Sequence, residues 1–482
     1  MRKAYRDYLA LAAKKIMNKA LVWFRRDLRL SDNPALQAAI KNNDLIIPVF
    51  IHAPEEEAPW QPGAASNWWL HYSLEHLSSR LNELGSPLIF RQGPTITTLK
   101  EIALKTGASR VYWNRLYEPA IRERDAQVKK SLSQASIECF DHGSALLFEP
   151  GTILTKTEQP YKVFTPFWRT ALSRMHLNPP LPPPSAINTY SPLDSLELKD
   201  LQLLPKINWD QTFHDHWQPG ELNSLKQLDL FIESNVRRYA ELRNRPDIKG
   251  TSRLSASLHF GEITPQQVAW AIELSRVENS AQERDMEVFM NEIGWREFAH
   301  HLLVHFPHTT SAPLRENFSR FPWRKGDTDD FKAWCQGKTG IPMIDAGMRE
   351  LWHTGWMHNR VRMVVASFLT KNQLISWQAG AHWFWDTLVD ANLASNTLGW
   401  QWTAGCGADA APFFRIFNPV RQGERFDADE TYVRLWCPEL QTIKQGCGHT
   451  PWLDKNPLSP PIVDLSHSRQ MALDAYAQIR QS

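Results

Sequence analysis

The sequence contains few cysteines, and each of them stands alone. Five cysteines occur among 482 residues, and no two of them form a Cys-x-x-Cys pair. This spacing argues against a disulfide scaffold and against a thiolate metal site. His301 and His305 have helical spacing, but no His-Glu-x-x-His motif accompanies them, so we expect no metal site. A Gly-x-Ser-x-Gly motif is also missing, so the sequence lacks the turn that presents the nucleophilic serine in many Ser-His-Asp hydrolases.

Long apolar runs are missing as well, and no stretch is apolar enough to span a bilayer. Residues 1–16 are basic and mildly amphipathic but lack the apolar core and cleavage signal of a secretory peptide. We therefore expect a cytoplasmic protein without a membrane partner, with Met17 as a candidate functional start. The formal net charge is only +2, so any nucleic-acid surface must be a local patch.

Tryptophan is abundant, with 21 residues. Packing in hydrophobic cores accounts for most tryptophans in proteins of this size. The excess nevertheless favours aromatic binding platforms or electron-transfer chemistry.

Two different patterns divide the chain. Residues 20–142 alternate short apolar runs with helical patterns, and the expected strands are 20–24, 45–51, 87–91, 110–114 and 137–141. The clearest helix spans 67–84, where leucines recur at helical spacing. This alternation predicts an α/β doubly wound parallel sheet. No Gly-x-Gly-x-x-Gly follows the first strand, which excludes the usual dinucleotide-binding form of such a sheet.

A Pro- and Ser-rich connector at 178–222 precedes an almost wholly helical pattern. Thr264-Pro265 and Pro342 predict helix starts, and Gly355 predicts a helix end. The fold class is therefore α/β plus all-α. The expected divisions are an extension (1–18), an α/β domain (19–150), a linker (151–224) and a helical domain (225–482).

Four groups of residues in the helical half suggest a site. The segment 250–255 reads Gly-Thr-Ser-Arg-Leu-Ser, which suits a phosphate group but is equally typical of a helix cap. Glu292, Trp295 and Arg296 share one helical face, as do Asn359, Arg362 and Met363, although ordinary surface and core residues follow the same spacing. Asp390, Asn392 and Asn396 are crowded among apolar neighbours, where an amide-rich heterocycle would satisfy them.

Taken in order, several segments resemble the photolyase/cryptochrome family. They are LVWFRRDLRLSDNPAL (21–36), YKVFTPFW (161–168), GTSRLS (250–255), NEIGWREF (291–298), GKTGIPMIDAGMREL (337–351), TGWMHNRVRM (354–363), GWQW (399–402) and FRIFNP (414–419). The resemblance covers nearly the whole chain from about residue 19. It implies a Rossmann-like domain joined by a linker to a helical domain that binds FAD.

The resemblance also implies roles for individual residues. The FAD contacts would be Tyr239, Thr251, Ser252, Arg253, Leu254, Ser255, Phe289, Glu292, Arg296, Arg362, Asp390, Asn392 and Asn396. Among these, Arg362 and Asp390 would pair beside the isoalloxazine, and Asn396 would face its central-ring nitrogen. Light-excited reduced FAD would donate an electron to a flipped-out pyrimidine dimer, and the electron would return after the ring splits.

Further residues would contact DNA or carry electrons. The DNA contacts implied by the resemblance are Arg243, Trp295, Arg296, Asn359, Arg360, Met363 and Trp402, and the electron-transfer chain is Trp323, Trp377 and Trp400. Glu292 would bind the thymine edge. The implied partner is UV-damaged DNA, bound by a monomer.

The family holds enzymes and photoreceptors, and three readings compete. Asn359 and Met363 occupy positions that carry histidines in (6-4) photoproduct enzymes, so cyclobutane-dimer repair is favoured. A photosensory cryptochrome is the alternative, but plant cryptochromes carry Asp at the position of Asn396 and add a long tail. An interaction protein that merely retains the fold would be expected to lose these residues. The segments NWWLHYSL (67–74), VYWNRLYEP (111–119) and WTAGCGADAAPFF (402–414) resemble the bacterial class III photolyases.

Two departures from the family pattern affect the cofactors. Asn392 replaces an Asp found in many relatives, which removes a charge beside the flavin. Ala120 and Ile121 replace the Asn-Glu pair that binds folate in class I enzymes. Class III relatives place folate elsewhere, so we expect 5,10-methenyltetrahydrofolate as antenna, with a deazaflavin or no antenna as alternatives.

Overall fold

Five short strands near the amino end of the chain form one parallel sheet. The computed structural model describes residues 17–190, 193–278, 283–410 and 414–481. The strands are β1 (Lys19–Phe24), β2 (Leu45–His52), β3 (Ile89–Gln92), β4 (Arg110–Asn114) and β5 (Glu138–His142). Their order is β3-β2-β1-β4-β5, and all neighbours are parallel. This confirms the predicted doubly wound sheet. Most of the predicted amino-terminal extension, residues 1–16, lies outside the described residues.

Helices cover both faces of this sheet. They are α2 (Pro34–Asn42), α3 (Ala64–Glu83), α4 (Thr95–Thr106) and α5 (Pro119–Gln134). Successive side chains of a strand point to opposite faces, so β1 contributes to two cores. Ala20, Val22 and Phe24 pack in one core with residues of α2 and α3, whereas Leu21 and Trp23 pack in the other with residues of α4 and α5. A strand buried on both faces explains the continuous apolar run in its sequence.

The connection to the helical part contains one helix that the sequence patterns did not predict. This is α6 (Phe164–Ser173), whose Phe167 and Trp168 are buried against Phe298. Beyond α6 the chain runs back beside the sheet, where Thr189 pairs with Ile46. The Pro-rich connector is therefore ordered against the sheet over its described residues.

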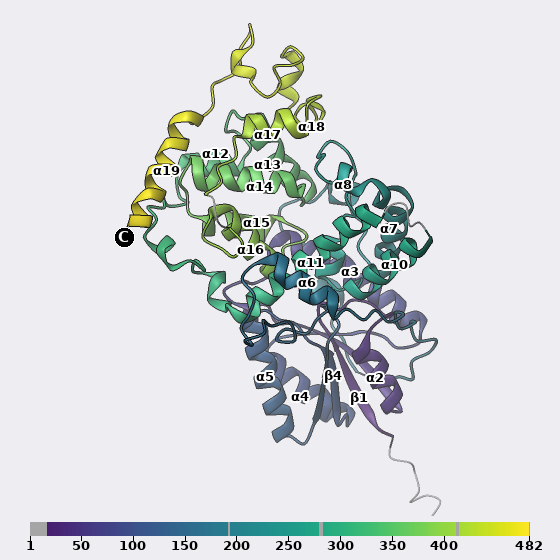
Figure 1. Cartoon of the computed structure of the whole chain (residues 1–482). Helices are drawn as coiled ribbons and strands as arrows, with labels where there is room; N and C mark the ends of the chain where they lie inside the picture. Colours follow the sequence, from purple (N-terminus) through teal and green to yellow (C-terminus); the bar gives the residue numbers. More distant parts are fainter. Residues whose placement is uncertain (1–16, 191–192, 279–282, 411–413, 482) are drawn as a thin grey trace, which may run out of the picture.

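The remainder of the chain is helical. Its α-helices are α7 (Glu221–Ser234), α8 (Tyr239–Leu242), α9 (Ser255–His259), α10 (Pro265–Glu278), α11 (Glu283–His305), α12 (Asp329–Cys335), α13 (Pro342–Thr354), α14 (Asn359–Ser367), α15 (Trp377–Thr387), α16 (Leu393–Ala404), α17 (Pro419–Phe426), α18 (Thr431–Trp436) and α19 (Leu465–Gln481). A π-helical turn, Phe368–Asn372, follows α14. Figure 1 shows α13–α16 gathered in the middle of this part, with the sheet at the other end of the molecule.

The predicted helix boundaries are confirmed at three places. Thr264 and Gln267 exchange side-chain-to-backbone hydrogen bonds at the start of α10, as a capping pair does. Pro342 begins α13, and Gly355 ends it with a left-handed φ of 65°.

A buried carboxylate joins the sheet to the helices. Glu221, at the start of α7, accepts hydrogen bonds from the backbone N–H groups of Leu30 (2.9 Å) and Ser31 (2.7 Å). Arg29 donates from the same loop to the carbonyl of Gly261 at 2.9 Å. These contacts place the carboxyl end of β1 beside α7 and α9. Within the described residues, no helix is long and apolar enough to cross a membrane.

Candidate cofactor and substrate site

A hollow between α14, α15 and α16 collects the polar residues singled out in the sequence. It encloses about 620 Å³, part of it open to solvent. Its lining is Asn359, Arg362, Met363, Ala366, Phe384, Leu388, Asp390, Ala391, Asn392, Ser395, Asn396, Gly399, Trp400 and Thr403. Apolar walls with a few converging polar side chains are typical of a small-molecule or cofactor pocket. We call it the central pocket.

Arg362 and Asp390 form an ion pair in its wall. Nη2 of Arg362 lies 2.9 Å and 3.1 Å from the two carboxylate oxygens of Asp390. Nε of Arg362 donates to the carbonyl of Met357 at 2.7 Å. The guanidinium is therefore held on two sides, which leaves its remaining N–H groups for a ligand.

Asn392 and Asn396 stand at the amino end of α16. Asn392 caps the helix, because its Oδ1 accepts from the N–H of Ser395 at 3.0 Å. Its Nδ2 lies 3.4 Å from Nδ1 of His259 and 3.4 Å from Nε2 of His300. Asn396 donates through Nδ2 to the carbonyl of Ala381 at 3.0 Å, and its Oδ1 makes no hydrogen bond within the described part of the chain. That oxygen is a free acceptor in the pocket wall.

The two histidines beside Asn392 were missed by the sequence analysis. Burial lowers the pKa of His259 well below its usual value and lowers the pKa of His300 to about 4. Arg296 adds to the shift at both rings. Both imidazoles are therefore neutral at physiological pH. No sequence motif marks them, because they lie on separate helices and meet Asn392 only in the fold.

The segment 251–255 lies where a phosphate-binding turn was expected. Arg253 has a left-handed φ of 54°, and its guanidinium contacts two tryptophan rings, 4.2 Å from the centre of Trp217 and 4.6 Å from that of Trp356. The hydroxyls of Thr251, Ser252 and Ser255 make no hydrogen bond to another described residue, so they are available to a ligand. Leu254 is buried in the core.

Tyr239 and Phe289 pack next to this segment. The two rings meet edge to face, with their centres 5.2 Å apart. Tyr239 is only 6% exposed and Phe289 only 3%. Phe289 therefore supports Tyr239 from the core.

The residues of the central pocket fit the expected flavin. A Cβ added at Gly399 would meet nothing within 4 Å, so the space beside α16 is open. The wall offers an ion pair, amides and a free Oδ1 to a heterocycle that carries carbonyl and N–H groups. The free hydroxyls and Arg253 suit its phosphates.

Five of the residues expected at the DNA side form one connected group that includes part of the pocket lining. Arg243 and Glu292 form an ion pair at 2.7 Å, and burial raises the pKa of Glu292 while Arg243 opposes that rise. Arg360 donates to Sδ of Met363 at 3.8 Å, and Asn359 and Met363 line the pocket itself. Two guanidinium groups and one carboxyl thus lie close together, and one of the guanidinium groups contacts the pocket residue Met363.

The two expected aromatic walls lie on helices that pack together, α11 and α16. Trp295 stacks on Phe164 of α6, with ring centres 3.9 Å apart and planes 9° apart. Trp402 lies beneath the guanidinium of Arg415 at 5.4 Å. Both indoles are partly exposed.

Arg296 does not join this connected group. Its guanidinium turns inward and donates to the carbonyls of Ala145 (2.8 Å) and Leu258 (3.4 Å). It also lies 3.4 Å from Glu297. In this arrangement it joins α11 to the segment after β5, so its expected DNA and FAD contacts stay predictions.

The three tryptophans of the expected electron-transfer chain lie on neighbouring segments. Trp400 is 2% exposed and Trp377 is 1% exposed, whereas Trp323 is partly exposed. The residue after Trp323, Arg324, forms a bridge with Ile375, two residues before Trp377. Trp400 packs on the helix that Trp377 begins, because a Cβ at Gly380 of α15 would overlap the Trp400 ring.

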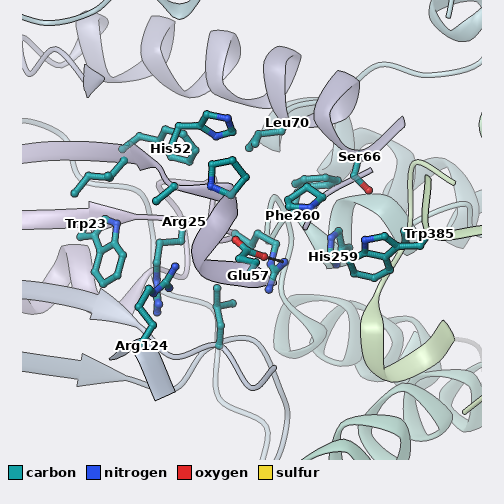
Figure 2. Close-up of a pocket in the computed structure, with 18 residues that line it drawn as sticks. Trp23, Arg25, His52, Glu57, Ser66, Leu70, Arg124, His259, Phe260 and Trp385 are labelled. Atoms are coloured by element: carbon teal, nitrogen blue, oxygen red, sulfur yellow. Dashed lines mark hydrogen bonds and ion pairs between the residues drawn. The ribbon is translucent and has the colours of Figure 1, made fainter. Parts of the chain in front are cut away.

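A second hollow lies where the sheet meets the helical part, and Figure 2 shows it. It encloses about 700 Å³ and is lined from β1, from the ends of β2 and β4, and from helices of both parts. Arg25 and Arg124 lie on the ring of Trp23, at 4.6 Å and 5.0 Å from its centre. Nε1 of Trp23 and Nε of Arg25 are buried without a hydrogen-bond partner within the described residues. We call it the interdomain pocket.

The sequence analysis named no residue of the interdomain pocket. One signal could have found it, since ligands of open parallel sheets bind at the carboxyl ends of strands where the strand order reverses. Here that place lies between β1 and β4, and the pocket is lined by Arg25 and Arg26 after β1 and by Leu116 after β4. Ala391 lines both pockets, so they share a wall.

In the described part of the chain, Nε2 of His301 and Nε2 of His305 are buried without a hydrogen-bond partner. Their ring centres lie 4.6 Å apart, and burial lowers the pKa of His301 to about 4. Among the residues that the structure describes, no group of three or more His, Cys, Asp or Glu side chains could hold a metal ion.

Comparison with known proteins gives two family matches. Residues 20–185 match the family described as DNA photolyase, and residues 289–478 match the FAD binding domain of DNA photolyase. The chain is 43% identical to a deoxyribodipyrimidine photo-lyase of Agrobacterium fabrum, over 96% of this chain and 98% of that protein. It is 37% identical to cryptochrome-2 of Arabidopsis thaliana, over 97% of this chain and 80% of that protein.

Among solved structures, the chain resembles a bacterial class III photolyase from Agrobacterium tumefaciens. The TM-score is 0.92 at 42% sequence identity, and the match covers 98% of this chain and 100% of the other.

Proposed function

The chain belongs to the photolyase/cryptochrome family, and we propose that it uses blue light to repair cyclobutane pyrimidine dimers in DNA. The observation that carries the proposal is the mouth of the central pocket. Asn359 and Met363 line it, and the Arg243–Glu292 pair stands beside it. A (6-4) photoproduct enzyme would carry histidines in place of Asn359 and Met363. The 43% identity to a deoxyribodipyrimidine photo-lyase supports the same substrate.

The helical part is an FAD-binding domain, and the central pocket is its cofactor site in this proposal. When bound and excited by light, reduced FAD supplies the electron that opens the cyclobutane ring. The protein binds and orients the cofactor. Arg362 and Asp390 hold the heterocycle from one side, and the free Oδ1 of Asn396 accepts a hydrogen bond from a ring N–H. Arg253 and the hydroxyls of the 251–255 segment bind the phosphates.

The entrance residues bind the lesion. A dimer within a duplex cannot reach a buried pocket, so it must be flipped out, at a cost of a few kcal/mol. Stacking of the flipped bases on Trp295 and Trp402 returns roughly 1–3 kcal/mol per base. Arg243 and Arg360 neutralise phosphates of the damaged strand without reading its sequence. Glu292 hydrogen-bonds the edge of the thymine.

The tryptophans supply electrons when the cofactor is oxidised. Trp400 stands in the pocket wall, Trp377 lies in the core, and Trp323 is partly exposed. This order runs from the pocket toward solvent, which suits a relay of electrons from an external reductant.

An antenna chromophore in the interdomain pocket completes the proposal. The aromatic and guanidinium surfaces of Trp23, Arg25 and Arg124 fit a planar heterocycle, and the unpartnered Nε1 and Nε atoms fit its carbonyl oxygens. We propose 5,10-methenyltetrahydrofolate, with a deazaflavin as the alternative. Ile121 is 1% exposed, so its side chain serves the core rather than a folate site at that position.

A photoreceptor is the second candidate function, supported by 37% identity to a plant cryptochrome over 97% of the chain. Asn396 favours repair over this alternative, because an amide at that place cannot donate the proton that an aspartic acid can. We further propose that the protein acts on UV-damaged DNA as a monomer in the cytoplasm.

A repair assay tests the proposal. The purified protein is chemically reduced, mixed with ultraviolet-irradiated oligothymidine, and illuminated with blue light beside a dark control. We expect base absorbance to recover in the light only. An oligonucleotide carrying a (6-4) photoproduct serves as the matched substrate and should stay unrepaired. If the oligothymidine is not repaired although FAD is confirmed bound, the repair function is refuted and the photoreceptor function is favoured.

A further inference from the structure

Glu350 is a buried carboxyl that none of the assigned roles uses. It lies on α13 and is 7% exposed. Its Oε2 accepts a hydrogen bond of 2.7 Å from the hydroxyl of Tyr432, which is itself 1% exposed and lies on α18. The backbone N–H of His358, at the start of α14, also favours the ionised form of this carboxyl. Residues of three helices thus surround the Glu350 carboxyl, which keeps a small exposed fraction.

Two guanidinium groups face this carboxyl without pairing with it. Arg253 and Arg362 both favour its ionised form, but neither forms an ion pair with it within the described residues. Arg362 is committed to Asp390 at 2.9 Å. Arg253 feels both Glu350 and Asp390, and burial lowers its pKa. These four charged groups form one electrostatic network beside the central pocket, because Arg362 and Asp390 line that pocket.

The charge of this network depends on Glu350 alone. With Glu350 ionised, two guanidinium groups balance two carboxylates. With Glu350 protonated, the network carries one net positive charge. Burial raises the pKa of Glu350 to about 7, while Tyr432 and the two arginines limit the rise. Both forms are therefore accessible near neutral pH, unlike those of an ordinary glutamate.

We propose that Glu350 is a positioning residue for the flavin, taking up a proton from solvent when bound FAD is reduced and releasing it on oxidation. The inference rests on the proposed FAD site. An external reductant supplies two electrons. One proton goes to the cofactor, which becomes an anion, and a second goes to Glu350. Protonation of Glu350 raises the net charge of the network by one, which offsets the negative charge in the pocket.

The other titratable groups around Glu350 do not take up this proton in its place. Burial and neighbouring arginines lower the pKa of His358 to about 3. Burial raises the pKa of Tyr432 and of Cys437 far above neutrality. Asp427 accepts from the backbone N–H groups of Tyr432 (2.8 Å) and Val433 (3.1 Å), whereas Glu350 accepts from the Tyr432 hydroxyl.

The test measures the reduction equilibrium of the FAD-loaded protein against redox dyes, without DNA, across the pH range on both sides of neutrality. Each proton taken up in a two-electron couple shifts this equilibrium tenfold per pH unit, or about 30 mV. Wild type should take up one proton at acid pH, where Glu350 is already protonated, and two on the alkaline side. A plot of the reduction potential against pH should therefore change slope near neutrality, and we call this change the break.

Glu350→Gln should remove the break, because the amide cannot titrate. It should also leave more FAD reduced than wild type does at alkaline pH. Asp345→Asn is the matched control on the same helix: Asp345 is buried, has a raised pKa and accepts from Thr339 and Gly340 instead. It should keep the break. A break that persists in Glu350→Gln overturns the proposal.

Tyr432→Phe keeps the test decisive if Glu350→Gln does not fold. Loss of the hydroxyl donor disfavours the ionised carboxyl and raises the pKa of Glu350. The break should then move to higher pH, and an unmoved break contradicts the inference. DNA is absent throughout, so a protein that fails to repair can still show the break, and a protein without the break can still repair.

Discussion

At the scale of single residues, the polar side chains of the central pocket are held by protein on one side. Arg362 is fixed by Met357 and Asp390, and the Nδ2 of Asn396 is fixed by the carbonyl of Ala381. Asn392 is fixed at both ends of its amide. Side chains oriented in advance lose less entropy when a cofactor binds.

Glu292→Ala should lower the yield of repair more than the affinity for damaged DNA. The substitution removes the proposed hydrogen bond to the thymine edge, worth about 1 kcal/mol or roughly fivefold. It also frees Arg243, which keeps its attraction for phosphate. Repair yield per absorbed photon and the dissociation constant for irradiated oligothymidine provide the two readouts. Glu287→Ala, on an exposed turn of the same helix, is the control. Equal losses in both readouts would contradict this role.

As pH falls from neutral to acid, the Asn392→Asp variant should lose less stability than wild type does. The pKa of His300 is about 4 in the folded protein and 6.5 ordinarily, so its contribution is present above pH 6.5 and lost as pH falls toward 4. A carboxylate beside His259 and His300 raises both pKa values and reduces that loss, by about 1.4 kcal/mol per unit.

The difference in Tm between this variant and wild type, measured at neutral and acid pH, checks the expectation. Asn418→Asp places the same change at the cap of α17, which accepts from the N–H of Arg421 and has no histidine contact. A difference independent of pH in Asn392→Asp would refute the assigned contact.

At the scale of elements, α16 carries the site. Its cap is Asn392, its first turn presents Asn396, and its last turns carry Trp400 and Trp402. Its close approach to α15 depends on Gly380, where a Cβ would overlap the ring of Trp400 and a methyl of Leu369. Gly399 is the opposite case, because a Cβ there would meet open space.

Gly380→Ala and Gly399→Ala should therefore separate folding from cofactor binding. Gly380→Ala overpacks the α15–α16 contact and should cost about 1–3 kcal/mol of stability. Gly399→Ala should raise the stability of the protein without FAD by about 0.5–1 kcal/mol, through helix propensity. Its methyl enters the central pocket, so FAD affinity should fall. Denaturation of the FAD-free forms and FAD titration supply the measurements. Unimpaired FAD binding by Gly399→Ala would argue against the pocket assignment.

At the scale of the whole molecule, the sheet and the helices are joined by buried polar contacts, and Figure 1 shows the two parts end to end. Glu221→Ala should leave the N–H groups of Leu30 and Ser31 buried and unpaired, at about 1–3 kcal/mol each. Tm should fall by several degrees. Asp229→Ala, on an exposed position of α7, should change stability by no more than about 0.5 kcal/mol. An unchanged Tm for Glu221→Ala would refute the role of this contact.

DNA affinity should depend on salt concentration. Because the net charge is only +2, attraction to the DNA phosphates must come from local clusters of basic residues. Arg360→Gln should reduce the slope of log affinity against log salt by about 1. Arg110→Gln serves as the control, since Arg110 lies on β4 and pairs with Glu138. Titrations at several salt concentrations measure both slopes. Equal slopes for Arg360→Gln and wild type would remove Arg360 from the DNA surface.

Much of the fold follows from local pattern. Apolar runs predicted all five strands, and Thr264, Pro342 and Gly355 predicted helix ends, because caps depend on adjacent residues. The helix α6 escaped prediction, since Phe167 and Trp168 are buried by residues distant in sequence, among them Phe298 of α11 and Ala408. The motif that contains Glu292, Trp295 and Arg296 did not reveal that Arg296 turns away from the other two. Its partner, the carbonyl of Ala145, is also distant in sequence.

The sequence by itself determined the family, the two-part architecture and the residue types available for chemistry, because motifs and periodicity are local properties of the chain. Only the tertiary structure decided which of those residues meet. His259 and His300 reach Asn392, Glu350 reaches Tyr432, and the interdomain pocket opens between β1 and the helices. Such contacts join residues far apart in sequence, and burial, which sets their pKa values, exists only once the helices have packed.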